Sequence, residues 1–453
     1  MQDKMTLRPG NDDSGVGLKM QPVTAGTAAG PEDEAMPVGH PQLMPLSWRH
    51  ILFIVLANFG VSMAYIVPLT YSLALRIDQL APGHEEVLGY ATGIASGIIV
   101  LTAPLFGVWS DRTRSRLGRR RPFMIGGAIV GFAALLVIAV APNVVVVCAA
   151  WVFANLGWGS AISAIQNVQA DRLPDSQRGK VSGLVGLASQ IAPVLGVSIA
   201  YAMGRNILLI FVVPGLIGIA FLLFFLISGG EKDSRHLETR TEPITGRMLF
   251  GKYFFNARAY PDFAWNLLGR FVFFLGLYAN TTFSTFFYAQ RLNLPVGEVA
   301  GTVAIVGILG IIAASLGAIG AGFFSDKLRR RKLFTMFGAV LFAVGAVVEA
   351  FAHSFPSLVA GALLMNLAIA VFNAVDQAIV LTVLPNRTET GRYMAIVTFA
   401  QKIPSAIAPL VATLIITIGS VGGEKNYTIL YLMGGVLALI GGLIVLTKVK
   451  SVR

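Results

Sequence analysis

A short basic loop between two apolar stretches occurs twice in this chain, and the repetition limits the folds that the chain can adopt. The first copy reads GVWSDRTRSRLGRRRPF at residues 107–123, and the second reads GFFSDKLRRRKLF at residues 322–334. Other residues recur at a separation of about 211 positions, namely Gln166 with Gln377, Gln190 with Gln401, and Pro193 with Pro404. Matches spread this widely indicate two homologous halves.

Most of the sequence lies in apolar stretches, since 55% of the residues are hydrophobic and only 13% are charged. A helix needs about 20 residues to cross a bilayer. Twelve stretches approach or exceed this length, at 49–75, 87–109, 122–141, 143–170, 180–203, 205–229, 263–290, 298–321, 332–352, 356–383, 391–418 and 427–447. The sequence therefore predicts an all-α membrane protein whose twelve transmembrane helices form two six-helix bundles, an arrangement typical of secondary transporters.

This arrangement divides the chain into four segments. We expect a disordered cytoplasmic tail at 1–47, an N-terminal bundle at 48–229, a cytoplasmic linker at 230–262 and a C-terminal bundle at 263–453. The tail is rich in Gly, Pro, Asp and Glu and lacks the basic and apolar regions of a cleaved signal peptide. The charged linker is long enough to let the two bundles move against each other, which alternating access requires.

The net charge of +12 reflects membrane topology. Most basic residues lie in the loops that follow the second, fourth, sixth, eighth and tenth stretches, whereas the loops at the other end contain only Arg76, Arg205, Arg291 and Lys425. Basic loops stay on the cytoplasmic side of a membrane. We therefore expect a multi-pass protein of the plasma membrane with both termini in the cytoplasm, and no nucleic-acid partner.

The paired basic loops resemble the signature loop of the major facilitator superfamily. The combination of SDR at 110–112 with GRRRPF at 118–123 is most similar to the branch of sucrose transporters and glycoside-pentoside-hexuronide:cation symporters. The resemblance extends over nearly the whole chain from about Trp48 onward. It implies a secondary active transporter that moves a small polar solute, a sugar or glycoside, by proton- or cation-coupled alternating access.

The resemblance also implies a gate built from charged residues at the cytoplasmic ends of the helices. In that superfamily the loop aspartate holds the two halves together in the outward-facing state, which would place Asp111 near Gly391 at the start of the eleventh helix. A carboxylate there can cap a helix N-terminus or pair with an arginine. Arg112 or Arg119 would then bridge to Asp171 at the end of the fourth helix.

Two further charged residues are candidates for the same gate. Asp326 is the second copy of Asp111, and a carboxylate has no use in setting topology. Arg178 lies in the loop 171–183, which resembles that of the glycoside symporters and is explained either as a structural turn or as a gating element. The alternative for all of these charges is that they only fix the orientation of the helices in the membrane.

Four ionisable residues lie inside apolar stretches, where burial is costly and a functional role is the default interpretation. Arg270 and Asp376 fall at similar depth in the seventh and tenth helices, and we predict that they pair and that Asp376 links transport to a proton. Lys402, in the eleventh helix, is a competing partner for Asp376. Glu349 is near the outer end of the ninth helix, where we expect it to be solvated. The alternative for Arg270 and Asp376 is a permanent ion pair that never titrates.

Uncharged polar residues recur along single faces of several helices. They suggest a central cavity whose amide, hydroxyl and aromatic groups bind a polyhydroxylated solute. The candidates for substrate binding are Asn58, Tyr65, Asn155, Gln166, Tyr278, Asn373 and Gln377, with Ser62, Trp158 and Asn366 nearby. The alternative is that these groups only form hydrogen bonds between helices.

The sequence favours a transporter over other classes of membrane protein. It contains no HExxH, GxSxG or phosphate-binding loop motif, so we predict that it is not an enzyme and needs no cofactor. Cys148 is the only cysteine, so no disulfide or metal cluster is expected. The partners that remain are a small-molecule substrate, H+ or another cation, and the lipid bilayer around a monomer. An exporter of drugs or metabolites with the same fold is the open alternative.

Overall fold

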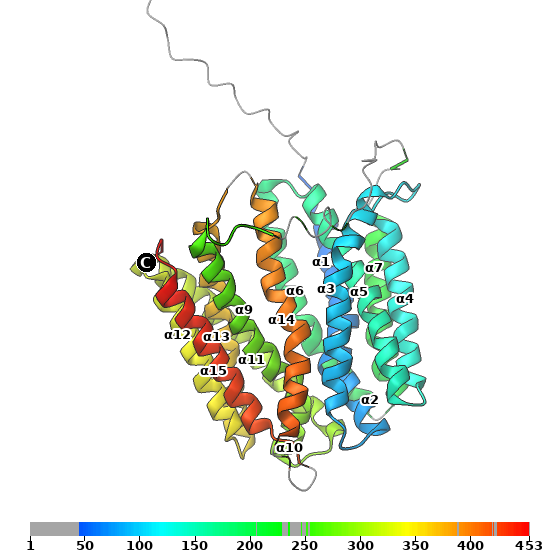
Figure 1. The fold of residues 1–453 in the computed structure, drawn as a ribbon. Coiled ribbons are helices and arrows are strands. Elements are labelled where there is room, and N and C mark those ends of the chain that lie inside the picture. Colours follow the sequence, from blue (N-terminus) through cyan, green and yellow to red (C-terminus); the bar gives the residue numbers. More distant parts are fainter. Residues whose placement is uncertain are drawn as a thin grey trace, which may run out of the picture. The chain divides into compact units, whose positions relative to one another are not determined.

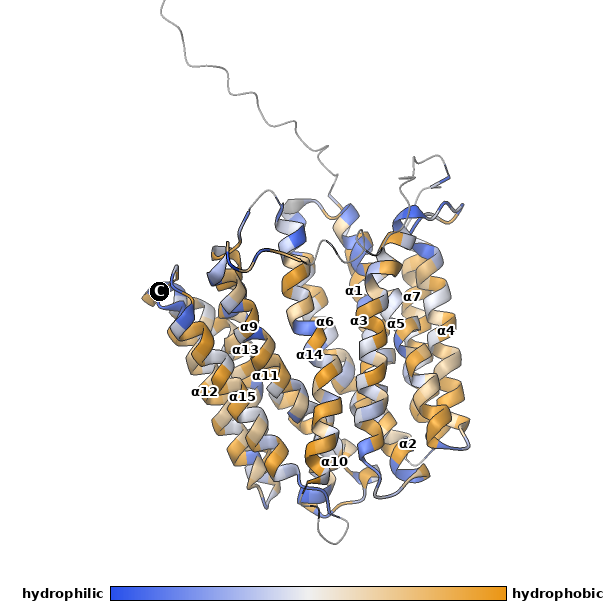
Figure 2. Ribbon diagram, viewed as in Figure 1, coloured by the Kyte–Doolittle hydropathy of each residue, from blue (hydrophilic) through white to orange (hydrophobic). Residues whose placement is uncertain are grey.

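The computed structural model describes residues 45–204, 206–228, 234–235, 246, 251, 254–386, 389–418, 420 and 424–452. The expected tail at 1–47 lies almost entirely outside the described residues, as do most of the expected linker at 230–262 and Arg205. The described chain is helical throughout, and apolar residues cover the middle of the helices while hydrophilic residues gather at both ends (Figure 2).

The first half contains six membrane-crossing segments. They are α1 (Trp48–Val67), continued by the π-helical turn η1 (Pro68–Ser72) and α2 (Leu73–Leu80), then α3 (Glu86–Arg112), α4 (Arg121–Val140), α5 (Val144–Arg172), α6 (Asp175–Ala202) and α7 (Ile207–Ser228). The second half has the same order. It consists of α9 (Pro261–Thr282) with α10 (Ser284–Leu292), a 3-10 turn η3 (Val296–Glu298), α11 (Ala300–Leu328), α12 (Arg331–Ala350), α13 (Phe355–Thr382), α14 (Thr390–Thr417) and α15 (Tyr427–Lys448).

These helices confirm the predicted fold class of an all-α membrane protein. Within the described part of the chain, eleven helices are long and apolar enough to span a membrane. The expected span at 263–290 is the one that does not meet this criterion. It is divided between α9 and α10, and α9 carries Asn266, Arg270 and Asn280. The seventh segment is therefore a polar, interrupted helix rather than a continuous apolar one.

The interruption occurs at equivalent places in the two halves. In the first half the helix changes to a π-helical turn at Pro68–Ser72, and in the second half it breaks at Phe283 between α9 and α10. Each first helix ends in an arginine that binds carbonyl oxygens at the end of its half's third helix. Arg76 donates to the Ile138 and Ala141 oxygens, and Arg291 donates to the Ala350 oxygen. The two halves that the sequence repeat predicts therefore also share the position of a helix break and of an arginine that binds the end of a neighbouring helix.

The signature loops also match in backbone conformation. Gly118 and Arg329, which the repeat aligns, both have positive φ, at 97° and 51°. Glycine adopts this region without a steric penalty. A side chain at the same place costs roughly 1–2 kcal/mol, so the shorter second loop is more strained than the first.

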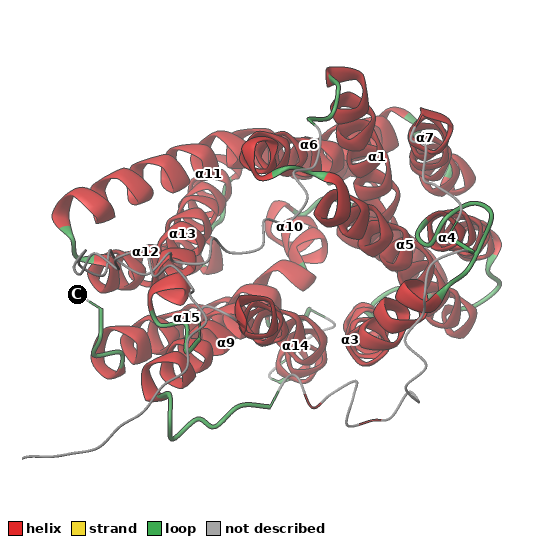
Figure 3. Ribbon diagram, turned by 90° about the horizontal axis from the view of Figure 1, so that it is seen from above, coloured by secondary structure: helices red, strands yellow, loops and turns green. Residues whose placement is uncertain are grey.

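The two halves meet along two pairs of helices, α3 with α14 and α6 with α11 (Figures 1 and 3). We call the end that carries the loops 113–120 and 329–330 the basic end, and the other the opposite end. The described chain begins and ends at the basic end (Figure 1). Along α3, Gly89 and Gly93 let α14 approach closely, because a side chain there would meet Thr413 or Leu410.

Within the first half, α4 and α5 are held together by small residues. A Cβ atom on Gly157 would lie 2.6 Å from the Gly127 carbonyl oxygen and would also meet the Gly131 backbone. Since these neighbours are backbone atoms, they cannot move aside as a side chain would. Small residues of this kind provide the close backbone approach on which helix packing in lipid depends.

We predict that Gly157→Ala lowers the melting temperature of the purified protein in detergent, because α4 and α5 must separate to admit the methyl group. The expected cost is about 1–3 kcal/mol, as for other overpacked cores. Gly179→Ala is the matched control, since Gly179 lies in α6 with nothing within 4 Å of its added Cβ. Alanine favours helix there by about 1 kcal/mol, so this variant should melt no lower than the parent. Equal melting temperatures for the two variants would contradict the packing argument.

Candidate functional site

A buried ion pair lies at the centre of the second half. Arg270 of α9 donates through Nη1 to Oδ2 of Asp376 on α13, and the two residues are 5% and 0% exposed. Each would be costly to bury alone, so loss of either partner would leave an uncompensated charge between α9 and α13. The sequence analysis predicted this pair from depth, and the structure places the two side chains in contact.

Three neighbours complete the surroundings of the pair. Asn266 donates through Nδ2 to the second Asp376 oxygen at 3.2 Å, and Nη2 of Arg270 donates to Gln401 Oε1 on α14 at 2.9 Å. The Arg270 guanidinium also lies 5.2 Å from the centre of the Phe274 ring. Two buried polar atoms, Nε of Arg270 and Oδ1 of Asn266, have no hydrogen-bond partner among the described residues. The cluster therefore joins three helices and keeps one donor and one acceptor that could still form hydrogen bonds.

Lys402 does not take the place predicted for it as a partner of Asp376. Its neighbour Gln401 contacts Arg270 instead, because consecutive residues of a helix point in directions about 100° apart. The Lys402 side chain is exposed and forms no hydrogen bond or ion pair with the described residues. It lies one turn before Ala406, which faces Gly97 of α3, so Lys402 lies on the side of α14 that faces the first half.

Glu349 also differs from the prediction. It was expected to be solvated near the end of the ninth helix, yet it is 1% exposed. Tyr288 of α10 donates to it through a long contact of 3.5 Å. The sequence pattern failed here because it cannot show that α10 and α13 cover this end of α12.

The first half carries a cluster of aromatic and amide groups. Tyr65 of α1 donates to Asn155 Oδ1 on α5 at 2.9 Å and stacks on Trp151, with ring centres 6.3 Å apart and planes at 3°. Asn155 in turn donates to the Trp151 carbonyl oxygen. The predicted residues Tyr65 and Asn155 thus come together, and Trp151 takes the part expected of Trp158.

The two clusters face each other. Tyr65 and Tyr278 are close enough for their hydroxyl groups to interact electrostatically, and Tyr278 of α9 lies beside Arg270 and Gln401. A separate cavity of about 200 Å³ is lined by both halves, with residues of α1 and α6 on one side and of α11 and α13 on the other. Its walls are mainly apolar, and its polar lining residues are Thr70, Gln190 and Asn366. The polar and aromatic groups that suit a hydroxylated ligand are those of the two facing clusters.

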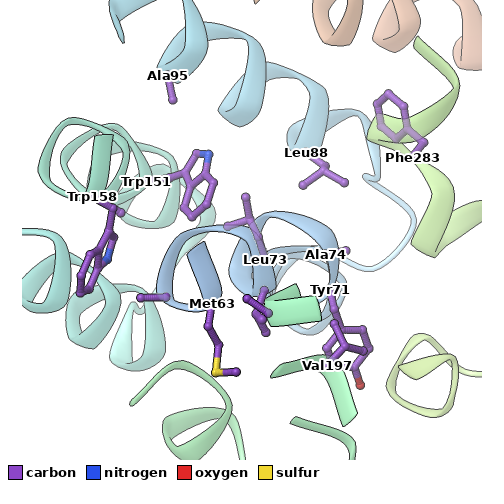
Figure 4. Packing of buried hydrophobic residues seen from close by; sticks show 14 of the residues in the cluster. Met63, Tyr71, Leu73, Ala74, Leu88, Ala95, Trp151, Trp158, Val197 and Phe283 are labelled. Carbon is purple, nitrogen blue, oxygen red and sulfur yellow. The ribbon is translucent and has the colours of Figure 1, made fainter. Parts of the chain in front are cut away.

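The remaining predicted substrate residues lie in different surroundings. Asn58 is buried and donates to the Ile54 carbonyl oxygen, so it serves its own helix. Asn373 is half-buried, whereas Gln166 and Gln377 are exposed. The side chains of these three residues form no hydrogen bond with the described residues. Trp158 is fully buried against glycines of α4 and α7, so it belongs to the core of the first half. Figure 4 shows Trp151 and Trp158 at separate positions along α5.

The opposite end is closed by contacts between the halves. Glu86 of α3 pairs with Lys425 at 2.7 Å, and Tyr427 donates to Glu85 at 2.6 Å. Burial raises the pKa of Glu85, although the Tyr427 hydroxyl and Lys425 oppose this shift. Phe283 packs beside Leu88 and Gly89 of α3 (Figure 4).

Two further contacts of this closure involve the interrupted first helices. Thr285 of α10 donates to the Thr70 carbonyl oxygen, and Tyr71 donates to the Gly297 carbonyl oxygen at 3.1 Å. The helix breaks therefore place turns of each half within reach of the other.

At the basic end, one arginine joins the predicted gating carboxylates of the first half. Arg120 contacts Asp111 at 2.7 Å and Asp171 at 3.3 Å, and it also donates to Ser110. Arg112 or Arg119 was expected in this position, and the structure shows Arg120 there. Arg120 directly precedes α4, so its side chain turns into the bundle, whereas Arg119 forms no contact of this kind with the described residues.

The second half repeats this junction. Arg331, which the repeat aligns with Arg120, contacts Asp326 at 2.9 Å and donates to Thr382, the counterpart of Asp171. The side chains of Asp111 and Asp326 remain 59% and 65% exposed. Each junction lies within its own half, so the predicted approach of Asp111 to Gly391 stays a prediction for another conformation. Arg178 is exposed in the first turn of α6.

With this geometry described, comparison with known proteins decides the family. The family model described as "Major Facilitator Superfamily" matches residues 50–321 and 311–452. This chain belongs to the major facilitator superfamily. It is accordingly a membrane transporter and not an enzyme. Among the described residues, no group of three or more His, Cys, Asp or Glu side chains is placed to hold a metal ion.

Similar proteins include two named as sugar transporters. Over 100 residues the chain is 34% identical to the human "Proton-associated sugar transporter A", a match that covers 21% of this chain and 13% of that protein. Over 87 residues it is 32% identical to the Schizosaccharomyces pombe "General alpha-glucoside permease", covering 19% and 14%. The matched stretch thus spans about a seventh of each relative. The crystal structure of the nucleoside transporter NupG superposes with a TM-score of 0.69 at 13% identity, over 88% of this chain and 99% of that one.

Several site residues were not found by the sequence analysis. Asn266 lies four residues before Arg270, so a search for polar residues on the same helical face would have found it. Gln190 and Gln401 were noted as a repeated pair without a role, and one now lines the cavity while the other contacts Arg270. Nothing in the sequence distinguishes Arg120 from Arg119, because the repeat matches arginine at both positions.

We predict that Arg120→Ala impairs transport and lowers the melting temperature, whereas Arg119→Ala changes neither appreciably. The buried guanidinium joins two carboxylates and a hydroxyl, but Asp111 and Asp171 are partly solvated, so the expected cost is about 1–2 kcal/mol. Melting in detergent and solute exchange in proteoliposomes would measure both effects. If the two variants behave alike, Arg120 contributes only a positive charge that orients the helices in the membrane.

Proposed function

We propose that this protein is a proton- or cation-coupled carrier of a sugar or glycoside that works by alternating access. The observation that carries the proposal is the pair of facing clusters, Tyr65–Asn155–Trp151 in one half and Tyr278–Gln401–Arg270 in the other. Sugar rings stack on aromatic faces, and each sugar hydroxyl needs a hydrogen-bond partner. The names of the two similar sugar transporters support the same substrate class.

We further propose the orientation and the moving parts. The concentration of arginine and lysine at the basic end supports a cytoplasmic location of that end in the plasma membrane. The segments 48–229 and 263–453 would rock as units of a monomer around the central site. In this structure the opposite end is closed by the Glu86–Lys425 pair and its neighbours. Opening the opposite end then requires these contacts to break, while Asp111 and Asp326 would form contacts between the halves at the basic end.

The proposal predicts uphill uptake of a sugar into proteoliposomes. Purified protein should accumulate a labelled glucoside such as sucrose or maltose above the external concentration when the lumen is alkaline, and only equilibrate it after a protonophore is added. A coupled carrier converts the pH gradient into a solute gradient, whereas a uniporter cannot. Efflux of lipophilic drugs without sugar exchange would instead support the alternative, an exporter. Absence of both sugar exchange and accumulation would contradict the proposed substrate class.

Asp376 is the residue that we propose as the coupling acid. Protonation would release Arg270, whose guanidinium would then depend on Gln401 and on the solute for hydrogen bonds. Because α9, α13 and α14 all meet at this pair, the charge state of Asp376 would be transmitted to three helices that line the centre of the fold. Lys402 follows Gln401 in α14, is exposed and faces the first half. A solute bound between the halves would therefore change the surroundings of its ammonium group.

We predict that Asp376→Asn keeps solute exchange and loses accumulation driven by a pH gradient. Removing one member of a buried pair leaves the other charge uncompensated, at a cost of about 3–5 kcal/mol, so this variant alone risks poor folding. The double variant Arg270→Gln with Asp376→Asn removes both charges and should recover thermal stability while still lacking accumulation. If either folded variant accumulates solute as the parent does, the pair is a permanent structural contact and coupling resides elsewhere.

A further inference from the structure

A second buried carboxyl group, Glu349, lies outside the central site. It belongs to the last turn of α12 near the opposite end, and its side chain packs against Gly361 of α13. Its hydrogen-bond donor is the Tyr288 hydroxyl at 3.5 Å, which is long for a bond between two oxygens. Within the described residues it takes part in no ion pair. A carboxyl group that is 1% exposed in such surroundings carries its proton, because an unpaired buried charge is strongly unfavourable.

The charged and titratable groups around Glu349 come from α10, α15 and the loop before α15. Tyr288 and Arg291 lie on α10, and Tyr431 and Tyr427 lie on α15. Arg291 is a cation of α10 that is bound to the Ala350 carbonyl oxygen and to Thr428, and it lies near Glu424. The guanidinium thus binds the backbone of the residue that follows Glu349 and is turned toward partners other than the Glu349 carboxyl group.

The short helix α10 connects this carboxyl group to the closure of the opposite end. One of its residues, Thr285, donates to the Thr70 carbonyl oxygen of the other half, and Tyr288, three residues later, contacts Glu349. Because α10 is separated from α9 at Phe283, it can move without the rest of the seventh segment. A change at Glu349 therefore reaches the contact between the halves through a single helix of 9 residues.

We propose that Glu349 is a second proton-binding site, distinct from Asp376, and that its protonation holds the opposite end closed. When the carboxylic acid releases its proton to water, the carboxylate needs either hydration or Arg291. Both require α10 to shift, and a shift of α10 breaks the contact between Thr285 and Thr70. Protonation of Glu349 then restores the closed arrangement. The inference goes beyond the proposed sugar transport and requires only the alternating-access motion.

A cysteine placed in the closed seam tests this proposal without any solute. Cys148 is the only native cysteine, so a Cys148→Ala background carrying Thr413→Cys has one thiol. Thr413 of α14 is 1% exposed and packs against Gly89 of α3, so a cysteine of similar size should react with N-ethylmaleimide only when the opposite end opens. Each rate is divided by that of the denatured variant at the same pH, which removes the pH dependence of the thiol itself.

Between about pH 6 and pH 9 we expect the normalised rate of the parent to rise by up to about tenfold per pH unit, as for one released proton. With Glu349→Gln, which keeps the neutral shape, the rate should stay low at every pH. With Tyr288→Phe the profile should move to higher pH, because the carboxylate loses its hydrogen-bond donor. This second variant provides the test if Glu349→Gln does not fold.

Glu85 is the control, since it is a carboxyl group of the same closure. Glu85→Gln should retain the steep rise that depends on Glu349. The proposal is overturned if the parent shows no pH dependence, if Glu349→Gln keeps the parent's profile, or if Tyr288→Phe leaves its midpoint unchanged. Loss of the rise in Glu85→Gln together with its survival in Glu349→Gln would assign the proton to Glu85. None of these outcomes depends on whether the carried solute is a sugar.

Discussion

The cost of placing charge in hydrocarbon determines how this protein arranges its polar residues. Arg270 and Asp376 pair across α9 and α13, while Asn266 donates to the second Asp376 oxygen and Gln401 accepts from Arg270. Because the pair is buried, its partners must come from several helices at fixed distances, and this fixes how the second half is assembled. The same cost explains why Glu349, which lacks a cation, holds a proton. Function and stability in this half therefore depend on the same few contacts.

Duplication supplies the rest of the architecture, and the two copies have diverged at the centre of the fold. Arg76 and Arg291 cap equivalent helices, and Arg120 and Arg331 form equivalent junctions at the basic end. By contrast, Gln190 lines the cavity and Gln401 binds Arg270, although the repeat aligns them. The structural positions have been kept by both halves, while the central ones have separated into an aromatic and amide cluster and a charged cluster. Such a division suits a carrier that binds solute on one side and couples a proton on the other.

Closure at the opposite end depends on short segments rather than on long helices. Thr285 and Tyr71 lie in or beside the helix breaks, and Glu85 and Glu86 lie at the start of α3. Short segments can move with little disturbance of the packed bundles, so they are suited to carry a gate. The junctions at the basic end have the opposite character, since each stays within its own half in this conformation. The two ends are therefore controlled by different chemistry, a proton-sensitive seam at one and arginine-centred junctions at the other.

The sequence by itself determined the membrane class, the helix positions to within a few residues and the duplicated halves, and it placed Arg270 and Asp376 at similar depth as candidates for a pair. Apolar length, charge distribution and residue depth are local properties, so they can be read along a single chain. Only the tertiary structure decided that Arg120 and not Arg119 forms the junction, that Lys402 is not the partner of Asp376, and that Glu349 is buried. One residue along a helix turns a side chain by about 100°, and whether it then meets a partner, water or lipid depends on neighbouring helices from distant parts of the chain. The direction of a side chain is therefore a property of the packed bundle, which no local pattern contains.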